Sequence, residues 1–204
     1  KHNFLLNDKI REENFEYNKN WIYQNNLLGF ENVDKEDLDV TLEQKKDSSP
    51  FNLVWLKNID RLVKLLPFDF KFKNYQLVDI GCGSGISTLY FASKYPFNSY
   101  YGFDFSKKLL ETAKINMEIF FSKNSLSLDI KFEVCDAINF NLNQKSVLFM
   151  FNPFGRNTIN KMILNNLNYL KNTKSIILYA NDHHVDLLSN YGKLIKRDFD
   201  FNLS

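Results

Sequence analysis

Residues 75–85 read Tyr-Gln-Leu-Val-Asp-Ile-Gly-Cys-Gly-Ser-Gly. The run before the glycines is short and mostly apolar, which is typical of a β-strand buried on both faces, and residues 86–94 can form a helix. The glycines therefore lie on a β-to-α turn. In an open α/β sheet, ligands bind beyond the carboxyl ends of the strands, and a glycine there lets the backbone approach the ligand without an intervening Cβ. The stretch thus predicts an α/β fold with a ligand site at this turn.

The residues around the glycine turn argue against phosphate ligands. A Walker loop needs a Lys followed by Ser or Thr after its last glycine, but Gly85 is followed by Ile86. The dinucleotide pattern Gly-x-Gly-x-x-Gly also fails, because its third glycine would fall at Ile86. Instead, Asp79 could face an ammonium, directly or through water, and Asp104 could accept hydrogen bonds from both ribose hydroxyls. The pattern favours a cationic nucleoside without phosphate, and S-adenosylmethionine is such a ligand.

Four stretches follow one another in an order that is found in one class of enzymes. They read Val78-Asp79-Ile80-Gly81-Cys82-Gly83-Ser84-Gly85, Gly102-Phe103-Asp104-Phe105-Ser106, Val134-Cys135-Asp136-Ala137 and Phe151-Asn152-Pro153-Phe154-Gly155. From about residue 50 to the C-terminus, the chain resembles the class I, Rossmann-like S-adenosylmethionine-dependent methyltransferases. The last stretch most resembles a poorly characterised bacterial subgroup. The resemblance implies a mostly parallel sheet in the order 3-2-1-4-5 plus a C-terminal strand, with helices on both faces, and residues 193–201 are expected to form that last strand.

The resemblance also implies contacts to S-adenosylmethionine and its product S-adenosylhomocysteine. Asp104 ends the second predicted strand about 20 residues beyond the turn, where ribose recognition requires an acid. Asp136 would accept a hydrogen bond from the adenine amino group, and the backbone amide of Ala137 would read a ring nitrogen. A helix start is the alternative for Asp104, but Ser106 already provides that cap, and a plain turn is the alternative for Asp136. The implied cofactor-binding residues are Asp79, Gly81, Cys82, Gly83, Gly85, Asp104, Phe105, Asp136, Ala137 and Asn152.

The acceptor side of the site is predicted at the ends of the fourth and fifth strands. Asn152 follows the apolar run 146–151, where enzymes of this fold that methylate amide side chains or adenine N6 carry Asn-Pro-Pro-Tyr or a close relative. The second Pro and the Tyr are absent here, which weakens the inference that this protein acts on those substrates. His183 and His184 follow the run 175–179, and adjacent histidines on extended backbone point apart, so they are poor joint metal ligands. We predict Asn152, His183 and His184 as catalytic residues, with one His as general base for a hydroxyl acceptor, and no metal.

Residues 1–47 are predicted as a helical N-terminal extension or cap on a methyltransferase domain at 48–204. An amphipathic helix or helix pair is expected between residues 4 and 28, either covering an edge of the sheet or closing over the substrate. Its apolar stripe consists of Leu6, Ile10, Tyr17, Trp21 and Leu28. The charged connection at 31–47 is expected to be mobile.

A second helix is expected just before the glycine turn. It should begin at Ser48-Ser49-Pro50 and end at Leu66, because a Ser side chain caps free amides and Pro fits a first turn. By the resemblance, this entry lies near the cofactor, so Ser49 and Phe51 are candidates for the pocket wall. A helix cap and a core aromatic are their structural alternatives.

Composition limits the partners and the compartment. The 26 Lys and Arg against 24 Asp and Glu give a formal net charge of +2, spread along the chain, so nucleic acid stays open as a partner but is not favoured. Cys82 and Cys135 lack metal-type spacing and are expected to be free thiols. No apolar run is long enough to span a bilayer, so we expect a cytoplasmic protein without a membrane partner, and the resemblance to the bacterial subgroup implies a bacterial protein.

These features predict an S-adenosylmethionine-dependent methyltransferase. Methyl transfer from a sulfonium is an in-line displacement, so the protein mainly positions the acceptor and excludes water. The acceptor is unidentified, and a small molecule or a glycan is the favoured class. A nucleic-acid or protein N-methyltransferase and a non-catalytic S-adenosylmethionine-binding protein are the alternatives.

Overall fold

The computed structural model describes residues 8–125 and 127–204. They fold around a five-stranded sheet in which all neighbouring strands are parallel, in the order β3-β2-β1-β4-β5. The strands are β1 (Gln76–Ile80), β2 (Ser99–Asp104), β3 (Ile130–Val134), β4 (Ser146–Phe151) and β5 (Ile176–Ala180). Ile80 pairs with Phe103, so the turn after β1 lies beside the end of β2. The predicted sheet and its order are confirmed.

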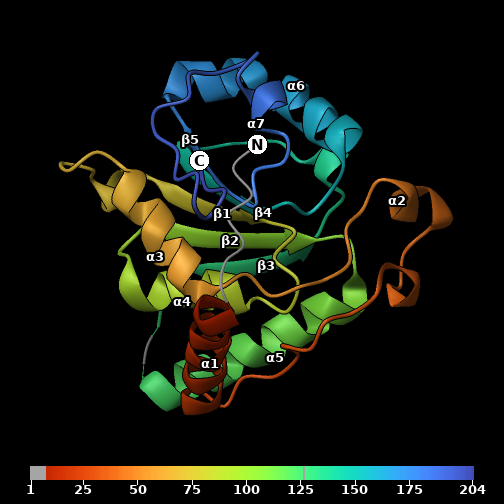
Figure 1. Ribbon diagram of the computed structural model, residues 1–204, viewed down its shortest axis with the longest axis vertical. Coiled ribbons are helices and arrows are strands. Elements are labelled where there is room, and N and C mark those ends of the chain that lie inside the picture. The colour runs from red at the N-terminus through yellow and green to blue at the C-terminus, as the bar shows by residue number, and fades with distance from the viewer. Residues whose placement is uncertain (1–7, 126) are drawn as a thin grey trace.

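Helices cover both faces of the sheet (Figure 1). They are α3 (Leu56–Leu65), α4 (Ile86–Lys94) and α5 (Lys107–Asn124) on one face, and α6 (Arg156–Thr173) and α7 (Val185–Leu188) on the other. Successive residues of β1 point to opposite faces, so Leu77 packs into the core beneath α3 and α4 while Val78 packs into the core beneath α6. Both side chains are fully buried. Burial on both faces explains why the central strands read as continuous apolar runs.

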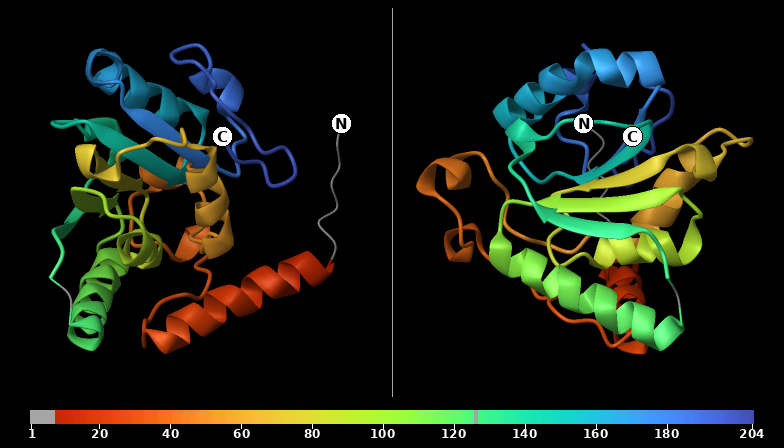
Figure 2. Two further views of the ribbon diagram at one scale, coloured as in Figure 1. Left: turned by 90° about the vertical axis from the view of Figure 1, so that its left-hand side faces the viewer. Right: turned by 180° about the vertical axis from the view of Figure 1, so that it is seen from behind.

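The N-terminal helix α1 (Asp8–Gln24) packs on other helices. The ring of Trp21 meets the ring of Tyr90 in α4 edge to face, with centroids 5.1 Å apart, and lies 6.3 Å from the ring of Phe120 in α5. Both views of Figure 2 show α1 outside the helical layer. Within the described residues, α1 therefore covers helices and not an edge of the sheet.

The apolar stripe predicted for this helix is wrong at its end. Leu28 is 50% exposed, whereas the side chain of Leu27 is buried. The reason is that Asn116 accepts from the backbone N–H of Leu28 at 2.8 Å and donates to its carbonyl at 2.9 Å. This clamp fixes the backbone so that Leu27 points into the core. Leu6 lies outside the described residues.

Residues 33–51 form a closed loop, which we call the strap. Val33 and Phe51 at its ends exchange two backbone hydrogen bonds of 3.0 and 2.9 Å. The strap contains the short helices η1 (Lys35–Asp37) and α2 (Leu42–Lys46). In Figure 1, α2 stands at the opposite end of the sheet from α3. The charged connection thus contains two short helices, and its mobility stays a prediction.

The helix predicted before the glycine turn begins later than expected. α3 starts at Leu56 and not at the Ser-Ser-Pro signal. Ser48 and Phe51 each take part in an antiparallel bridge with distant backbone, so this segment is extended and cannot join the helix. The helix ends at Leu65, in agreement with the stop predicted before Pro67.

The C-terminal strand predicted near residues 193–201 is wrong. Within the described chain this segment forms no regular strand, and isolated bridges join Leu203 to Ala180 and to Asp198. Asp198 and Leu203 exchange backbone hydrogen bonds of 2.8 and 3.0 Å, which fold the chain into a tight turn. The turn leaves only the last residues to pair with the end of β5.

Candidate cofactor and acceptor site

The glycine turn after β1 is covered closely on its outer side. Gly83 has φ +53°, a conformation that other residues rarely adopt, and a Cβ added there would collide with the ring of Phe51. Gly81 has φ +71°, and a Cβ there would lie 2.6 Å from Cβ of Pro153. Glycine is therefore needed at both positions because the backbone is left-handed there and because other residues lie very close. The strap lies against Gly83, and the loop after β4 lies against Gly81.

The Asp104 carboxylate joins the glycine turn to the start of α5. Its Oδ2 accepts the backbone N–H of Gly83 at 3.0 Å, and its Oδ1 accepts the backbone N–H of Ser106 at 2.9 Å. Ser106 also caps α5 as predicted, since its Oγ accepts from the N–H of Leu109 at 3.2 Å. Burial raises the pKa of Asp104 to about 6, although these backbone donors oppose the shift. The acid predicted for the ribose therefore touches the turn itself.

Asp79, the last acid before the turn, is buried against α4. Its Oδ2 accepts the hydroxyls of Ser87 and Thr88, both at 2.6 Å. Burial raises its pKa to about 6, and the two hydroxyls oppose the shift. Asp79 therefore fixes the first turn of α4 to the end of β1, a role that sequence reasoning did not assign to it.

Asp136 lies at the carboxyl end of β3, immediately before the buried Ala137. Its Oδ1 accepts the backbone N–H of Ile138 at 3.2 Å, and its Oδ2 accepts a side-chain N–H of Gln44 at 3.0 Å. The residue predicted to read adenine therefore already holds an amide group from the strap.

The remaining predicted cofactor contacts flank the turn. Cys82 points into the core, where burial raises the pKa of its thiol, and its backbone N–H donates to the carbonyl of Phe103 at 3.0 Å. Gly85, with φ +77°, begins α4. Phe105 is partly exposed and follows Asp104. Any contact between Cys82 and a cofactor would therefore be made by its backbone.

The structure brings Asn152 to the glycine turn. Asn152 has φ +41°, and the following Pro153 packs on Gly81. Its Oδ1 accepts the hydroxyl of Tyr179 at 2.9 Å. Tyr179 is completely buried in β5, and sequence reasoning missed it because an aromatic residue within an apolar strand signals only a core position.

The two histidines lie where β5 leads into α7. His183 is exposed and His184 is partly buried. Among the described residues, the hydroxyl of Tyr179 and not an imidazole is hydrogen-bonded to Asn152. The structure places both residues on the correct rim but does not join their rings to the site.

Three polar side chains of the strap were missed from the sequence. Asp39 accepts the hydroxyl of Ser106 and the N–H of Lys108 at 3.1 Å, at the start of α5. Asp47 accepts the N–H of Thr158 at 2.8 Å, at the start of α6. The third is Gln44, on Asp136. A weak signal existed, because α6 begins after a glycine that cannot cap it, so an acceptor had to come from elsewhere.

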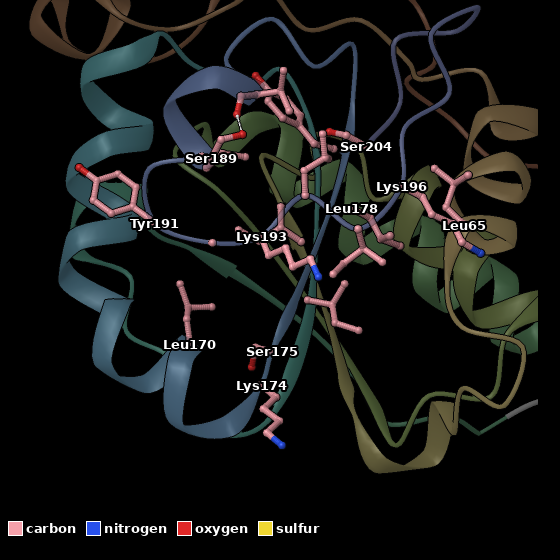
Figure 3. Close-up of a pocket in the computed structure, with 18 of the residues that line it drawn as sticks. Leu65, Leu170, Lys174, Ser175, Leu178, Ser189, Tyr191, Lys193, Lys196 and Ser204 are labelled. Atoms are coloured by element: carbon pink, nitrogen blue, oxygen red, sulfur yellow. Dashed lines mark hydrogen bonds between the residues drawn. The ribbon is translucent and has the colours of Figure 1, made fainter.

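An apolar cavity of about 720 Å³ lies between β5, α6, α7 and the C-terminal segment, and Tyr179 is among the residues that line it (Figure 3). Leu170 and Leu178 line it from α6 and β5, and Lys174 and Lys193 stand at its edge. None of the residues predicted for cofactor binding or catalysis lines this cavity.

Two further findings concern metal ions and membranes. Residues 8–125 and 127–204 contain no group of three or more His, Cys, Asp or Glu side chains that could hold a metal ion. No helix in the same two ranges is long and apolar enough to cross a membrane.

The sheet order and the match to a family model identify a Rossmann-like methyltransferase domain of the S-adenosylmethionine-dependent class. Residues 71–200 match a protein family described as a methyltransferase domain. Since this match covers well over half of the chain, the protein belongs to that family. A comparison with curated proteins finds no match.

Solved structures resemble the chain at low identity. A Thermoplasma acidophilum protein is 19% identical, with a TM-score of 0.46, over 66% of this chain and 65% of that one. A Thiobacillus denitrificans S-adenosylmethionine-dependent methyltransferase, solved with S-adenosyl-L-homocysteine, is 20% identical, with a TM-score of 0.42, over 62% and 47%. A Haemonchus contortus phosphoethanolamine N-methyltransferase is 18% identical, with a TM-score of 0.39, over 61% of this chain and 25% of that one. The chain thus covers less than two thirds of each of these proteins.

Proposed function

We propose that this protein transfers the methyl group of S-adenosylmethionine to an acceptor that is a small molecule or a glycan. One observation carries the proposal. The buried carboxylate of Asp104 ends β2 and contacts the backbone N–H of Gly83 at 3.0 Å. An acid beside a turn that has no phosphate-binding cation suits a ribose and does not suit nucleotide phosphates.

The carboxyl rim supplies the remaining cofactor contacts in this proposal. Asp136 and the backbone N–H of Ala137 bind the adenine, and Asp104 binds the ribose hydroxyls. Asp79 fixes the turn and faces the ammonium through water, because its own oxygen already accepts two hydroxyls. The bound donor supplies a methyl group that the sulfonium charge has already activated. The protein therefore mainly has to align the acceptor and exclude water.

Asn152 is the acceptor-orienting residue in this proposal. Its Oδ1 accepts the hydroxyl of Tyr179, which leaves the two amide N–H groups to donate to an oxygen of the acceptor. His183 or His184 acts as general base only if the acceptor is a hydroxyl, since a neutral amine can attack with little assistance.

The Asn-Pro-Phe-Gly sequence at 152–155 supports membership of the poorly characterised bacterial subgroup. Asn-Pro at this place also keeps an N-methyltransferase acting on nucleic acid or protein as a second candidate. The formal net charge of +2 argues against a polyanionic acceptor. A non-catalytic binding protein would bind S-adenosylhomocysteine but give no methyl transfer.

Calorimetry with four ligands tests the cofactor assignment. S-adenosylmethionine and S-adenosylhomocysteine should bind far better than ATP or NAD, because the turn offers acids and no phosphate-binding cation. Equal or tighter binding of ATP or NAD would overturn the assignment.

Methyl transfer tests the role of Asn152. Acceptors can be found by incubating the protein with radiolabelled S-adenosylmethionine and fractionated metabolite or glycan extracts. Asn152→Ala should then reduce single-turnover transfer far more than cofactor affinity, because acceptor orientation is lost while other cofactor contacts remain. Asn172→Ala, at an exposed position of α6, is the matched control. Wild-type rates in Asn152→Ala would remove this residue from the mechanism.

A further inference from the structure

The strap occupies two of the positions that the proposed function gives to the cofactor. A side-chain N–H of Gln44 donates to Oδ2 of Asp136 at 3.0 Å, where the adenine amino group would donate. The ring of Phe51 lies on the backbone of Gly83, in the space that the absence of a Cβ opens. An S-adenosyl ligand and the strap in this position would therefore compete for the same contacts.

The Gln44 contact reproduces the chemistry of adenine recognition. Its side-chain NH₂ is a planar two-hydrogen donor, as the adenine exocyclic amine is. The other Asp136 oxygen accepts the N–H of Ile138 at 3.2 Å, so Oδ2 is the oxygen that an adenine would use. The Gln44 carbonyl accepts the N–H of Thr41 at 3.1 Å, which fixes the direction in which the NH₂ points.

We propose that the strap is an internal competitor of the cofactor, in which Gln44 takes the place of the adenine amine on Asp136 and Phe51 closes the glycine turn. Binding of an S-adenosyl ligand then requires the strap to move. The inference rests on the proposed function, because it uses Asp136 as the adenine contact.

The attachment of the strap suits such a movement. Asp39 and Asp47 dock it at the N-termini of α5 and α6, and the backbone pair of Val33 and Phe51 closes its base. Backbone hydrogen bonds also join residues 47–49 to residues 153–155, so the part of the strap before residue 47 is the part that is held by side chains. Gln44 lies between the two docking residues along the chain. If only a fraction of molecules is open, the apparent dissociation constant is the intrinsic one divided by that fraction. Any change that breaks the Gln44 contact should therefore tighten ligand binding.

The test is calorimetry of S-adenosylhomocysteine with the full chain and Gln44→Glu. The Glu side chain keeps an oxygen for the N–H of Thr41 but replaces the donor to Asp136 by a second carboxylate. We expect binding about fivefold to tenfold tighter than wild type, the effect of losing one such hydrogen bond in the closed state. Gln44→Ala should change affinity in the same direction.

Leu42→Glu is the matched control, since Leu42 is 79% exposed in the same short helix and the substitution adds the same charge. It should leave affinity unchanged. Unchanged or weaker binding in both Gln44 variants would overturn the inference, as would equal tightening in Leu42→Glu.

Limited trypsin digestion supplies an independent readout at Lys45 and Lys46 of the strap. Saturating S-adenosylhomocysteine should speed cleavage there, measured by mass spectrometry, because ligand binding displaces the strap. Protection by the ligand would show that the strap closes over it and would overturn the competition.

The two proposals fail in distinguishable ways. If neither wild type nor the Gln44 variants bind S-adenosylhomocysteine, the proposed function falls and the inference falls with it. If wild type binds and the Gln44 variants bind equally well, the proposed function stands and only the competition is wrong.

Discussion

The glycine turn and the strap meet at Gly83 and Phe51, yet they are held in different ways. The turn connects two regular elements, and its backbone bonds to the end of the neighbouring strand β2. Apart from a backbone bridge between residues 47–49 and residues 153–155, the strap depends on side chains whose partners lie 67, 92 and 111 positions away in the chain. The site thus combines a part fixed by the sheet with a cover whose position depends on a few polar contacts.

The largest expected effect comes from breaking the fixed part at Asp104. Asp104→Ala should weaken S-adenosylhomocysteine binding by about 1.5–3 kcal/mol, the range for losing hydrogen bonds to a charged group. Two backbone amides, those of Gly83 and Ser106, would also lose their acceptor. Calorimetry measures the affinity, and circular dichroism checks that the variant is folded.

Two controls sharpen this prediction. Asp104→Asn keeps a side-chain oxygen for one backbone amide and should lose less affinity than the Ala variant. Asp69→Ala removes an exposed acid outside the rim and should change nothing. Wild-type affinity in a folded Asp104→Ala protein would show that the ribose is bound elsewhere.

Protonation of Asp79 and Asp104 should have a smaller effect on the affinity for S-adenosylhomocysteine. The affinity should fall by up to about tenfold per pH unit for each carboxyl. Burial raises the pKa of each to about 6, and neighbouring acids add to the shift, Asp104 acting on Asp79 and Asp39 on Asp104. The ligand requires the ionised forms, so its affinity should be constant above pH 7 and fall as the pH drops through 6. Calorimetry at several pH values tests this, and constant affinity down to pH 5 would contradict it.

Stability without ligand should change in the opposite direction. A carboxyl whose pKa is raised by folding binds more protons in the folded than in the unfolded state between about pH 4 and 6. The contribution of Asp79 and Asp104 is therefore fully present below about pH 4 and is lost as the pH rises through 6. Thermal unfolding of Asp104→Asn against wild type over this range isolates one of the two groups.

The smallest effect, on stability, is expected from removing the hydrogen bond that Asp47 of the strap accepts from Thr158. Asp47→Ala removes the acceptor at the start of α6 and should cost about 1 kcal/mol, as for other helix caps. For a chain of this size that lowers Tm by about 2–4 °C. Glu43→Ala, an exposed strap position, should leave Tm unchanged. An unchanged Tm in Asp47→Ala would show that the start of α6 does not depend on the strap.

The same contrast explains what the sequence could reveal. The strands, α4 and the cap of α5 at Ser106 follow from local apolar runs and nearby polar residues, and these predictions are confirmed. The placement of Asp104 beside the turn follows from parallel pairing of β1 and β2, since carboxyl ends of parallel strands share one edge.

The strap could not be predicted because its determinants are far apart in the chain. Nothing near Gln44 signals a partner at Asp136, and the hydroxyl of Tyr179 is hidden in an apolar strand. The Ser-Ser-Pro entry failed for the same reason, since a bridge between Ser48 and Phe154 overrides the local helix signal.

The bond between Asp47 and Thr158 also sets an order of events during synthesis. Asp47 leaves the ribosome 111 residues before its partner, which at about 5–20 residues per second is a wait on the order of ten seconds. Over that interval the docking partners of the strap are synthesised one after another, first Ser106, then Asp136 and last Thr158. Translation therefore supplies the last docking partner of the strap after strands β1 to β4 and before β5.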